Sequence, residues 1–200
     1  MNLKEKFTWI YEHNYWKSKE SVSGGGSELA NTKELIKALP QIIEKYNINS
    51  MLDVPCGDFN LMRKVRFPLM FNYVGVDIVD DLIINNRKKY HSLTRQFIVR
   101  DATCDKLPML QELIFSKDFF IHLSLDNIIK SILNFKDTGS VYLMTCSDPT
   151  ATVNKDQDNG GAWRPLNLML SPFNFPEPLE IVRTNTTIMG LWLLSSIKIE

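Results

Sequence analysis

Three short apolar runs, each carrying an aspartate near its end, shape the first half of the chain. The runs cover residues 48–54, 73–78 and 97–102. Their acids, Asp53, Asp77 and Asp101, follow one another at intervals of 24 residues. An apolar run of this length bounded by turn residues predicts a buried strand, and each interval holds a strand plus the crossover to the next parallel strand. We therefore expect a parallel sheet whose carboxyl edge carries a row of three carboxylates.

Helical spacing of apolar residues marks the segments between and around these strands. Leu35, Leu39, Ile42 and Ile43 recur at the period of a helix over residues 28–46, with Lys and Glu on the opposite face. Further helices are expected over residues 3–16, 80–89 and 125–135, and further strands over 113–116, 141–145, 179–183 and 191–194. Between the fifth strand and the final pair, polar residues and prolines leave no helical pattern. The alternation of strands and helices predicts an α/β protein, and 200 residues suit one domain.

The first predicted strand runs into the turn Pro55-Cys56-Gly57-Asp58. Proline fixes its own φ and glycine admits positive φ, so the two together predict a sharp bend. A strand, a tight turn and an acid are the parts of a nucleotide pocket, which lies at the carboxyl ends of the strands in an open α/β sheet. Taken alone, the turn fits an ordinary strand-to-helix connection equally well, but the row of acids favours the pocket.

The turn and the row of acids resemble the class I methyltransferases that use S-adenosylmethionine (SAM). In that family the first loop lies against the methionine part of SAM, the acid ending the second strand takes the ribose hydroxyls, and the acid after the third strand takes the adenine amino group. The resemblance implies SAM as cofactor, S-adenosylhomocysteine (SAH) as product, and as cofactor-binding residues Asp53, Pro55, Cys56, Gly57, Asp77, Ile78, Asp101, Ala102, Lys117 and Ser27. It also implies a Rossmann-like three-layer α/β sandwich, in which a mostly parallel seven-stranded sheet has an antiparallel last strand and the C-terminal half is trimmed.

The first loop departs from the family's more usual acid-x-Gly-x-Gly-x-Gly pattern. Pro55 stands at the place of the first glycine and Phe59 at that of the third. A dinucleotide site needs glycine where the pyrophosphate approaches the helix N-terminus. SAM has no phosphate, so the departure counts against a nicotinamide-dependent oxidoreductase more than against a SAM enzyme.

A narrower group of bacterial proteins, often encoded in capsule and surface-polysaccharide gene clusters, resembles the chain over about residues 7 to 194. The shared segments are residues 20–24, 55–58, 122–124 and 163–167. This resemblance implies a single methyltransferase domain over residues 1–200, with an N-terminal helix and lid loop over 1–30, a SAM-binding core over 47–145, a substrate loop over 146–178 and a terminal strand pair over 179–195.

Asp118 and His122 are the candidates for catalysis, and they stand four residues apart. On a helical turn they would share a face. Imidazole can take a proton from a hydroxyl near neutral pH, and a nearby carboxylate can hold its tautomer. The alternative is a buried histidine that bonds a backbone carbonyl and organises the turn, and the residues alone leave both open. Ser124 is the expected N-cap of the helix that follows.

Candidate substrate-binding residues flank the core on both sides in the chain. They are Tyr15, Trp16, Ser21, Ser23, Trp163, Arg164 and Asn167. Trp offers a stacking face, Arg a bidentate fork for a carboxylate or phosphate, and Asn a directional amide. The glycine run at 24–26 is either a flexible linker or a loop that closes over cofactor or substrate. The alternative is that Trp163 anchors its loop to the core while Arg164 faces solvent, but substrate recognition is the favoured role of Arg164 and Asn167.

The charge balance and the cysteine count limit the kinds of partner that the protein is expected to bind. Lys plus Arg and Asp plus Glu both number 23, so no net positive charge indicates nucleic acid. No apolar segment resembles a signal peptide or a membrane span, which predicts a cytoplasmic protein without membrane contact. Three cysteines without a CxxC pair argue against a disulfide framework and a structural zinc site, and no metal is expected. The expected partner is a small-molecule acceptor, and a monomer and a homodimer stay open.

These observations predict methyl transfer from SAM to an oxygen of a small polar acceptor. The subgroup resemblance implies a sugar, a sugar nucleotide, or a phosphoryl or phosphoramidate intermediate of surface-polysaccharide (capsule) biosynthesis. His122 would take the proton of a sugar hydroxyl, whereas an anionic acceptor would need no base and would depend more on Arg164. The alternatives are a non-catalytic partner subunit of the same fold and, less favoured, a nicotinamide-dependent oxidoreductase or a nucleic-acid methyltransferase.

Overall fold

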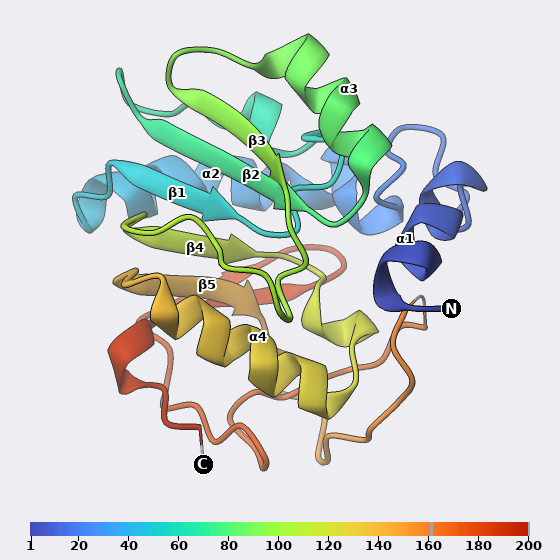
Figure 1. Cartoon of the computed structure of the whole chain (residues 1–200). Helices are drawn as coiled ribbons and strands as arrows, with labels where there is room; N and C mark the ends of the chain where they lie inside the picture. The colour runs from blue at the N-terminus through green and yellow to red at the C-terminus, as the bar shows by residue number, and fades with distance from the viewer. Residues whose placement is uncertain (161, 200) are drawn as a thin grey trace.

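In residues 1–160 and 162–199, which the computed structural model describes, seven strands form a sheet in the order β3-β2-β1-β4-β5-β7-β6 (Figure 1). The strands are β1 (Ser50–Asp53), β2 (Asn72–Asp77), β3 (Arg95–Val99), β4 (Leu113–Ser116), β5 (Tyr142–Cys146), β6 (Glu180–Arg183) and β7 (Ile188–Leu193). Neighbouring strands from β3 to β5 are parallel, and β7 runs antiparallel to both β5 and β6. The expected mostly parallel sheet with an antiparallel last strand is confirmed.

Helices cover both faces of this sheet. The covering helices are α2 (Leu29–Lys45), α3 (Asp80–Tyr90) and α4 (Leu125–Asp137), while α1 (Leu3–Glu12) lies beside the carboxyl ends of the strands. Short 3₁₀ turns are η1 (Gly25–Ser27), η2 (Met62–Lys64), η3 (Phe120–His122) and η4 (Leu194–Ser196). Side chains of α2 and α3 belong to one buried cluster, and those of α4 belong to the other. Figure 1 shows α4 in front of the sheet and α2 behind it, which gives the three-layer sandwich. None of the described helices combines the length and apolar character needed to cross a membrane.

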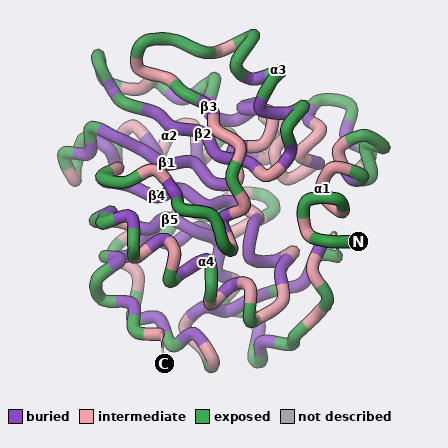
Figure 2. The backbone as a smooth tube through the Cα atoms, in the orientation of Figure 1, coloured by how far each residue is buried: buried purple, intermediate pink, exposed green. Residues whose placement is uncertain are grey.

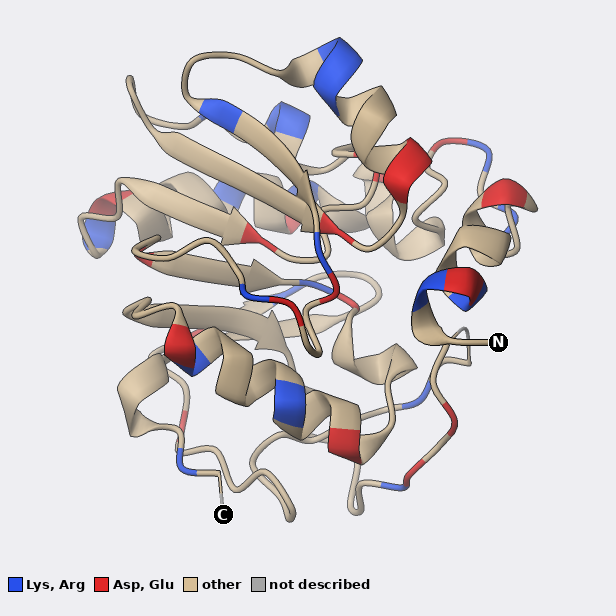
Figure 3. Ribbon diagram, viewed as in Figure 1, with Lys and Arg blue, Asp and Glu red and all other residues tan. Residues whose placement is uncertain are grey.

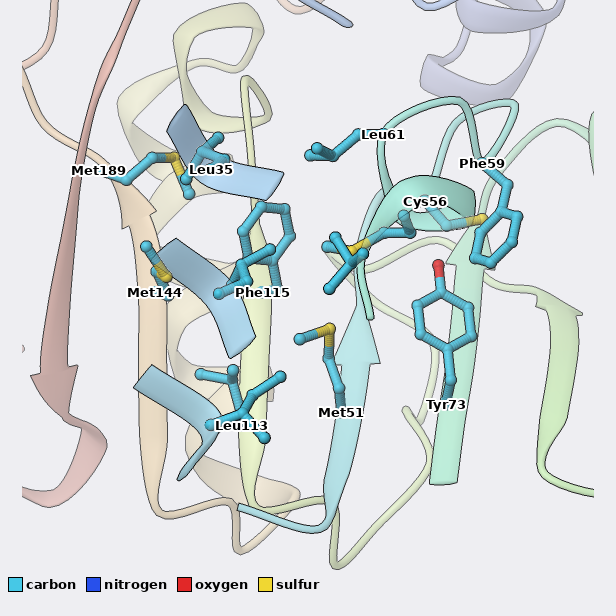
Figure 4. Close-up of a cluster of buried hydrophobic side chains, with 14 of the residues drawn as sticks. Leu35, Met51, Cys56, Phe59, Leu61, Tyr73, Leu113, Phe115, Met144 and Met189 are labelled. Carbon is cyan, nitrogen blue, oxygen red and sulfur yellow. The ribbon is translucent and has the colours of Figure 1, made fainter. Parts of the chain in front are cut away.

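The apolar stripe of α2 explains how this helix is held. Leu35 and Leu39 are fully buried, and Ile43 is almost so. Figure 4 shows Leu35 next to Met189 of β7, and Met144 of β5 belongs to the same buried cluster. Burying one such side chain contributes about 1.5–3 kcal/mol relative to leaving it exposed. The apolar stripe that predicts α2 therefore also fixes the position of this helix against the strands β5 and β7.

The N-terminal helix is shorter than its aromatic pattern predicts. The pattern extends to residue 16, but α1 ends at Glu12. Asn14 and Lys17 take positive φ values of 41° and 56°, which a right-handed helix cannot contain. The chain therefore turns before the glycine-rich loop instead of running into it as a helix.

The chain between β5 and β6 is irregular, and its described residues contain no helix. The buried Asn154 side chain organises part of this segment. Its Nδ2 donates to the carbonyls of Asn167 and Ser171, both at 2.9 Å, and its Oδ1 accepts from the N–H of Asn167 at 2.9 Å. Side-chain bonds of this kind satisfy backbone groups that a helix would otherwise pair. The C-terminal half is thus trimmed, as the resemblance implies.

The adjacent strands β1 and β4 lie in the centre of the sheet, and all their residues are buried (Figure 2). From β1 the chain first builds outward through β2 and β3, and it then returns to build β4 and β5 on the other side. Connections that diverge in this way leave a crevice at the carboxyl ends of the strands, where ligands bind in open α/β sheets.

Candidate active site

A cleft opens at the carboxyl ends of β1, β2 and β4, with an empty volume of about 1100 Å³ including the part open to solvent. The residues expected to bind cofactor all line it: Ser27, Asp53, Pro55, Cys56, Gly57, Asp77, Ile78, Asp101, Ala102 and Lys117. Figure 3 shows acidic segments at the tips of β1 and β2 and in the loop after β3. The tertiary structure therefore brings the predicted row of carboxylates to one cavity.

The turn after β1 is held by the neighbouring strand. The N–H of Cys56 donates to the carbonyl of Val76 at 2.8 Å, and the N–H of Gly57 donates to Asp77 Oδ2 at 3.2 Å. Gly57 has φ of +53°, and a Cβ at this position would clash with Ser23 Oγ. Glycine is therefore required here for the backbone conformation and for the close approach of the loop that contains Ser23.

Phe59, at the place of the family's third glycine, also has a positive φ of 63°. A left-handed conformation costs a non-glycine residue about 1–2 kcal/mol. The ring is 1% exposed and packs edge-on against Tyr73 and Phe97, with centroid distances of 5.1 and 5.3 Å (Figure 4). Burying a phenylalanine ring contributes about 1.5–3 kcal/mol, which offsets that cost. The chain therefore keeps the backbone turn of the glycine pattern while filling the space with an aromatic ring.

Two buried carboxyls form the floor of the cleft. Burial raises the pKa of Asp53 to about 8, although the hydroxyl of Tyr73, which donates to Asp53 Oδ2, lowers it in part. Burial also raises the pKa of Asp77 to about 6, against the backbone N–H groups of Val79 and Gly57 that favour the charged form. A positively charged ligand in the cleft would favour ionisation of both groups.

The loop after β3 forms the far wall of the cleft. Asp101 Oδ1 accepts from the N–H of Thr103 at 2.8 Å and from its hydroxyl at 2.7 Å, which fixes the carboxylate against its own turn. The neighbouring Ala102 is buried, and its N–H donates no hydrogen bond within the described residues. Because Ala102 lines the cleft, this donor is available to a ligand.

The loop before α2 is tied to the turn after β1 through Asp58. Ser21 Oγ donates to Asp58 Oδ1 at 2.9 Å, and the N–H of Val22 donates to Asp58 Oδ2 at 3.1 Å. In return, the N–H of Asp58 donates to Ser23 Oγ at 3.2 Å. The hydroxyl of Ser21 is thus used inside the protein and does not line the cleft, whereas Ser23 does. We call residues 20–27 the lid.

Two further side chains fasten the lid at its C-terminal end. Asn60 Nδ2 donates to the carbonyl of Ser27 at 2.9 Å, and Lys117 Nζ donates to the carbonyl of Gly26 at 2.9 Å. Asp58 and Asn60 were not among the predicted site residues. The reciprocal pairing of Asp58 with the lid spans 35 residues, and no local pattern in the sequence indicates it.

The four-residue spacing of Asp118 and His122 predicts that they share a helical face. In the structure they do not. Asp118 has φ of +52° and precedes the 3₁₀ turn η3. Its carboxylate is ion-paired with Lys117, and its Oδ1 accepts from Cys146 Sγ at 3.3 Å. The prediction that Asp118 holds the His122 tautomer is therefore wrong, because its carboxylate is bonded to Lys117 and to Cys146 at the end of β5.

The backbone carbonyl of Ala162 takes the place that Asp118 was expected to fill. His122 Nδ1 lies 3.2 Å from that carbonyl oxygen, so Nδ1 carries the proton and Nε2 keeps a lone pair. The imidazole stacks on Trp16 at a centroid distance of 5.3 Å and meets Phe7 edge-on at 6.5 Å. Burial lowers the pKa of His122, which favours the neutral ring. Asp118 and His122 nevertheless both line the cleft.

A segment far along the chain wraps the turn that carries His122. We call residues 156–160 and 162–164 the clasp. Arg164 is 8% exposed, and its guanidinium donates to the carbonyls of Ile121 at 3.3 Å and Leu123 at 2.6 Å. The N–H of Gly160 donates to the carbonyl of His122 at 2.7 Å. The guanidinium is therefore engaged inside the protein, and it neither faces solvent nor presents a fork to an anion.

The remaining expected substrate residues divide into three groups. Asn167 is buried, its Nδ2 donates to the carbonyl of Ala151 at 3.2 Å and its Oδ1 accepts from the N–H of Met169 at 3.1 Å, and it does not line the cleft. Tyr15 is half exposed and does not line the cleft, whereas Trp16 does. Trp163 is 64% exposed at the rim of a second hollow next to the cleft. Within the described residues, no group of three or more His, Cys, Asp or Glu is arranged to hold a metal ion.

Comparison with solved structures shows the fold of class I SAM-dependent methyltransferases. Human N-acetylserotonin methyltransferase in complex with SAM aligns with a TM-score of 0.62 at 12% identity, over 96% of this chain and 59% of that one. Magnesium protoporphyrin IX methyltransferase (ChlM) from Synechocystis PCC 6803 with bound SAH aligns with a TM-score of 0.59 at 9% identity, over 94% and 95% of the two chains.

A third structure widens the range of chemistry found on this fold. The N-methyltransferase NodS from Bradyrhizobium japonicum WM9, in complex with SAH, aligns with a TM-score of 0.54 at 12% identity, over 69% of this chain and 72% of that one. No protein-family model and no curated protein matches the chain in sequence. At these identities the likeness shows the fold, and the substrate must be argued from the site.

Proposed function

We propose that this protein transfers a methyl group from SAM to an oxygen of a small polar acceptor. One observation carries the proposal: the strand-end acids Asp53, Asp77 and Asp101 and the Gly57 turn line a single cleft at the switch point of the sheet. The solved structures of the same fold include complexes with SAM and with SAH, which supports this cofactor for the cleft.

The donor and acceptor groups of the cleft fit SAM. Each oxygen of Asp77 accepts one backbone N–H, and a carboxylate oxygen can take a second donor, so both can also accept ribose hydroxyls. The free N–H of Ala102 and the neighbouring Asp101 offer a donor and an acceptor for an adenine edge. SAM carries positive charge on its sulfonium and amino groups, which suits a floor formed by two carboxyls. When bound, the cofactor supplies an electrophilic methyl group.

The residues around the cleft would position the acceptor and receive its proton. Holding the acceptor oxygen about 3 Å from the methyl carbon, in line with the departing sulfur, accounts for most of the expected rate. His122 Nε2 has a free lone pair because Nδ1 is bonded to the Ala162 carbonyl, so it can take the hydroxyl proton. The lid, fastened by Lys117 and Asn60, would exclude water from the reacting groups.

The acceptor class follows from the bacterial subgroup that the sequence resembles. We propose a sugar, a sugar nucleotide, or a phosphoryl or phosphoramidate intermediate of surface-polysaccharide assembly. A non-catalytic partner subunit is the second candidate, because the bond between His122 and Ala162 and the stack on Trp16 would also suit a purely structural histidine.

Calorimetric titration with SAH tests the cofactor. The wild-type protein should bind SAH with micromolar affinity, and Asp77→Ala should weaken binding at least about a hundredfold, because two charge-assisted hydrogen bonds are worth roughly 3 kcal/mol or more. Asp81→Ala is the matched control, since Asp81 is an exposed acid in the first turn of α3 that does not line the cleft. Absence of SAH binding to the folded wild-type protein would contradict the proposal, and stabilisation by NAD instead would revive the oxidoreductase.

The role of His122 is tested by transfer of labelled methyl groups from SAM to an extract of polysaccharide precursors. We expect His122→Ala to lower turnover at least about tenfold, the lower end of general-base catalysis, without changing SAH affinity. Turnover that is unaffected by His122→Ala would assign the histidine a structural role. A protein that binds SAH but transfers no methyl group would favour the partner subunit.

A further inference from the structure

A second hollow, with an empty volume of about 710 Å³ including the part open to solvent, adjoins the cofactor cleft. Three segments surround it: the chain following β5 around Asp148, residues 163–166, and the tip of the β6–β7 hairpin at residues 184–187. Asp118 lines both this hollow and the cleft. An acceptor bound in the second hollow would therefore reach the cofactor alongside Asp118, where the two hollows adjoin.

The charge of the second hollow does not suit an anion. The charged residues that line it are Asp118, Asp148 and Arg164. Both terminal nitrogens of Arg164 are bonded to backbone carbonyls, and its Nε is buried. Asp118 is paired with Lys117, which leaves Asp148 and the guanidinium of Arg164 as the remaining charged groups of the lining. A phosphoryl group would thus meet the carboxylate of Asp148, while the guanidinium of Arg164 already directs both terminal nitrogens to backbone carbonyls.

The polar groups left open in the hollow instead suit hydroxyl donors. Asp148 Oδ1 accepts from the N–H of Thr150 at 2.9 Å and from its hydroxyl at 2.6 Å, which fixes the carboxylate in place. Asp148 Oδ2 and the hydroxyl of Thr186 form no hydrogen bond within the described residues. A fixed carboxylate oxygen and a free hydroxyl can bind two neighbouring hydroxyl groups of one ligand.

An exposed aromatic ring completes the hollow. Trp163 lies at its rim and is 64% exposed, although tryptophan is highly buried on average. The face of an indole ring is apolar and rigid, so it can cover the C–H face of a flat ring while polar groups opposite bind its hydroxyls. A saturated sugar ring has this combination of an apolar face and hydroxyl edges, whereas a compact phosphoryl group does not.

We propose that the second hollow is the acceptor subsite and that it takes an uncharged sugar ring. This rests on the proposed function, and among the acceptor classes named there it selects a neutral sugar moiety over a phosphoryl or phosphoramidate group. In the reaction an acceptor hydroxyl oxygen forms a bond to the methyl carbon, and the carbon–sulfur bond breaks with its electron pair moving to sulfur. The hydroxyl proton passes to His122 Nε2. Asp118 orients the hydroxyl at the passage between the two hollows.

Ligand-observed NMR on the SAH-loaded protein tests the subsite with a panel of methyl pyranosides and the corresponding sugar phosphates. We expect saturable binding of at least one neutral glycoside at millimolar concentration, with the phosphates binding more weakly than their neutral parents. Trp163→Ala and Asp148→Asn should each weaken this binding at least about fivefold, the equivalent of one lost contact of about 1 kcal/mol. Trp163→Phe should retain it, because it preserves an apolar ring.

Matched controls separate the subsite from general effects. Trp9→Ala removes another exposed tryptophan, and Asp158→Asn neutralises another exposed acid of the same long loop; neither residue lines either hollow. Both should bind glycoside like the wild type, and all variants should keep wild-type SAH affinity. Tighter binding of the phosphates, insensitivity to Trp163 and Asp148, or no neutral glycoside bound would each overturn the subsite. If a glycoside bound but SAH did not, the hollow would still be a sugar site, but the proposed methyltransferase function would be contradicted.

Discussion

The walls of the cofactor cleft and the clasp around His122 lie at the same edge of the sheet but are joined by contacts of different range. In the cleft, Asp53 pairs with Tyr73 and Gly57 with Asp77, and each pair is 20 residues apart and joins β1 or the turn after it to β2. In the clasp, Arg164 reaches Ile121 across 43 residues, and Asn159 reaches Ser124 across 35. The cleft thus follows from the repeat of the sheet, whereas the clasp depends on the path of a long irregular loop.

This difference explains which residues take which role. Strand ends present their side chains at a fixed edge, so the acids of the cleft are available to a ligand. The clasp has no helix or strand to satisfy its own backbone or that of the His122 turn, so its polar side chains are used as internal partners. A polar residue on an irregular loop is therefore as suited to holding the loop as to binding substrate.

Removal of the guanidinium of the clasp should give the largest effect on stability. Arg164→Met would leave the carbonyl of Leu123 without its donor, which costs about 1–3 kcal/mol. The carbonyl of Ile121 would lose one of its two donors and keep the Gln157 side chain at 2.9 Å, and the lost bond is worth about 1 kcal/mol. We expect the free energy of unfolding to fall by about 3 kcal/mol in urea titration, with SAH affinity within about threefold of the wild type. Arg66→Met, at an exposed arginine, should change stability little. If Arg164→Met were as stable as the wild type, Arg164 would not brace the turn.

The raised pKa of Asp53 should make the free energy of unfolding depend on pH. The pKa of Asp53 is about 8 in the folded protein, whereas an aspartate in an unfolded chain has a pKa near 3.8. At pH values between these two, the folded state retains a proton that the unfolded chain has lost. The free energy of unfolding should therefore fall as pH rises through this window, by about 2 kcal/mol between pH 6 and 8. Asp53→Asn should flatten this part of the profile in the SAH-free protein, and Asp81→Asn should not. An unchanged slope in Asp53→Asn would show that Asp53 is ionised throughout.

A smaller effect is expected at the joint between the lid and the turn after β1. Asp58→Ala removes the acceptor for the hydroxyl of Ser21 and the N–H of Val22. We expect SAH to dissociate about five- to tenfold faster in stopped-flow measurements, since loss of these bonds should favour opening of the lid by roughly 1–1.5 kcal/mol. Asp80→Ala, at an exposed acid outside the cleft, is the control. Dissociation at the wild-type rate would mean that the lid does not limit release.

The smallest effect should come from the N-cap of α4. Ser124 Oγ accepts from the N–H of Asn127 at 3.3 Å, as the sequence predicts. Ser124→Ala should lower the free energy of unfolding by about 1 kcal/mol. Ser171→Ala, at an exposed serine of the irregular segment, should cost less in the same urea titration. Equal losses in the two variants would show that the cap adds nothing to α4.

Much of the molecule could be read from the chain because its information is local. Apolar runs and helical stripes predict the order of strands and helices, and the even spacing of Asp53, Asp77 and Asp101 places them along one edge. The lining of the cleft follows from this placement once the resemblance supplies the cofactor. Ser124 at the start of α4 and the trimmed segment after β5 are local features of the same kind.

The direction of side chains on irregular backbone was decided only by the tertiary structure. Asp118 adopts a left-handed φ, Arg164 turns inward to two carbonyls, and Asp58 clamps the lid. None of these has a period, because each depends on which distant segment arrives beside it. The second hollow has the same origin, since Asp148, Trp163 and Thr186 meet only when the long loop and the terminal hairpin close around the end of β5. Periodic structure carries its own geometry along the chain, whereas a loop takes its geometry from the contacts it finds.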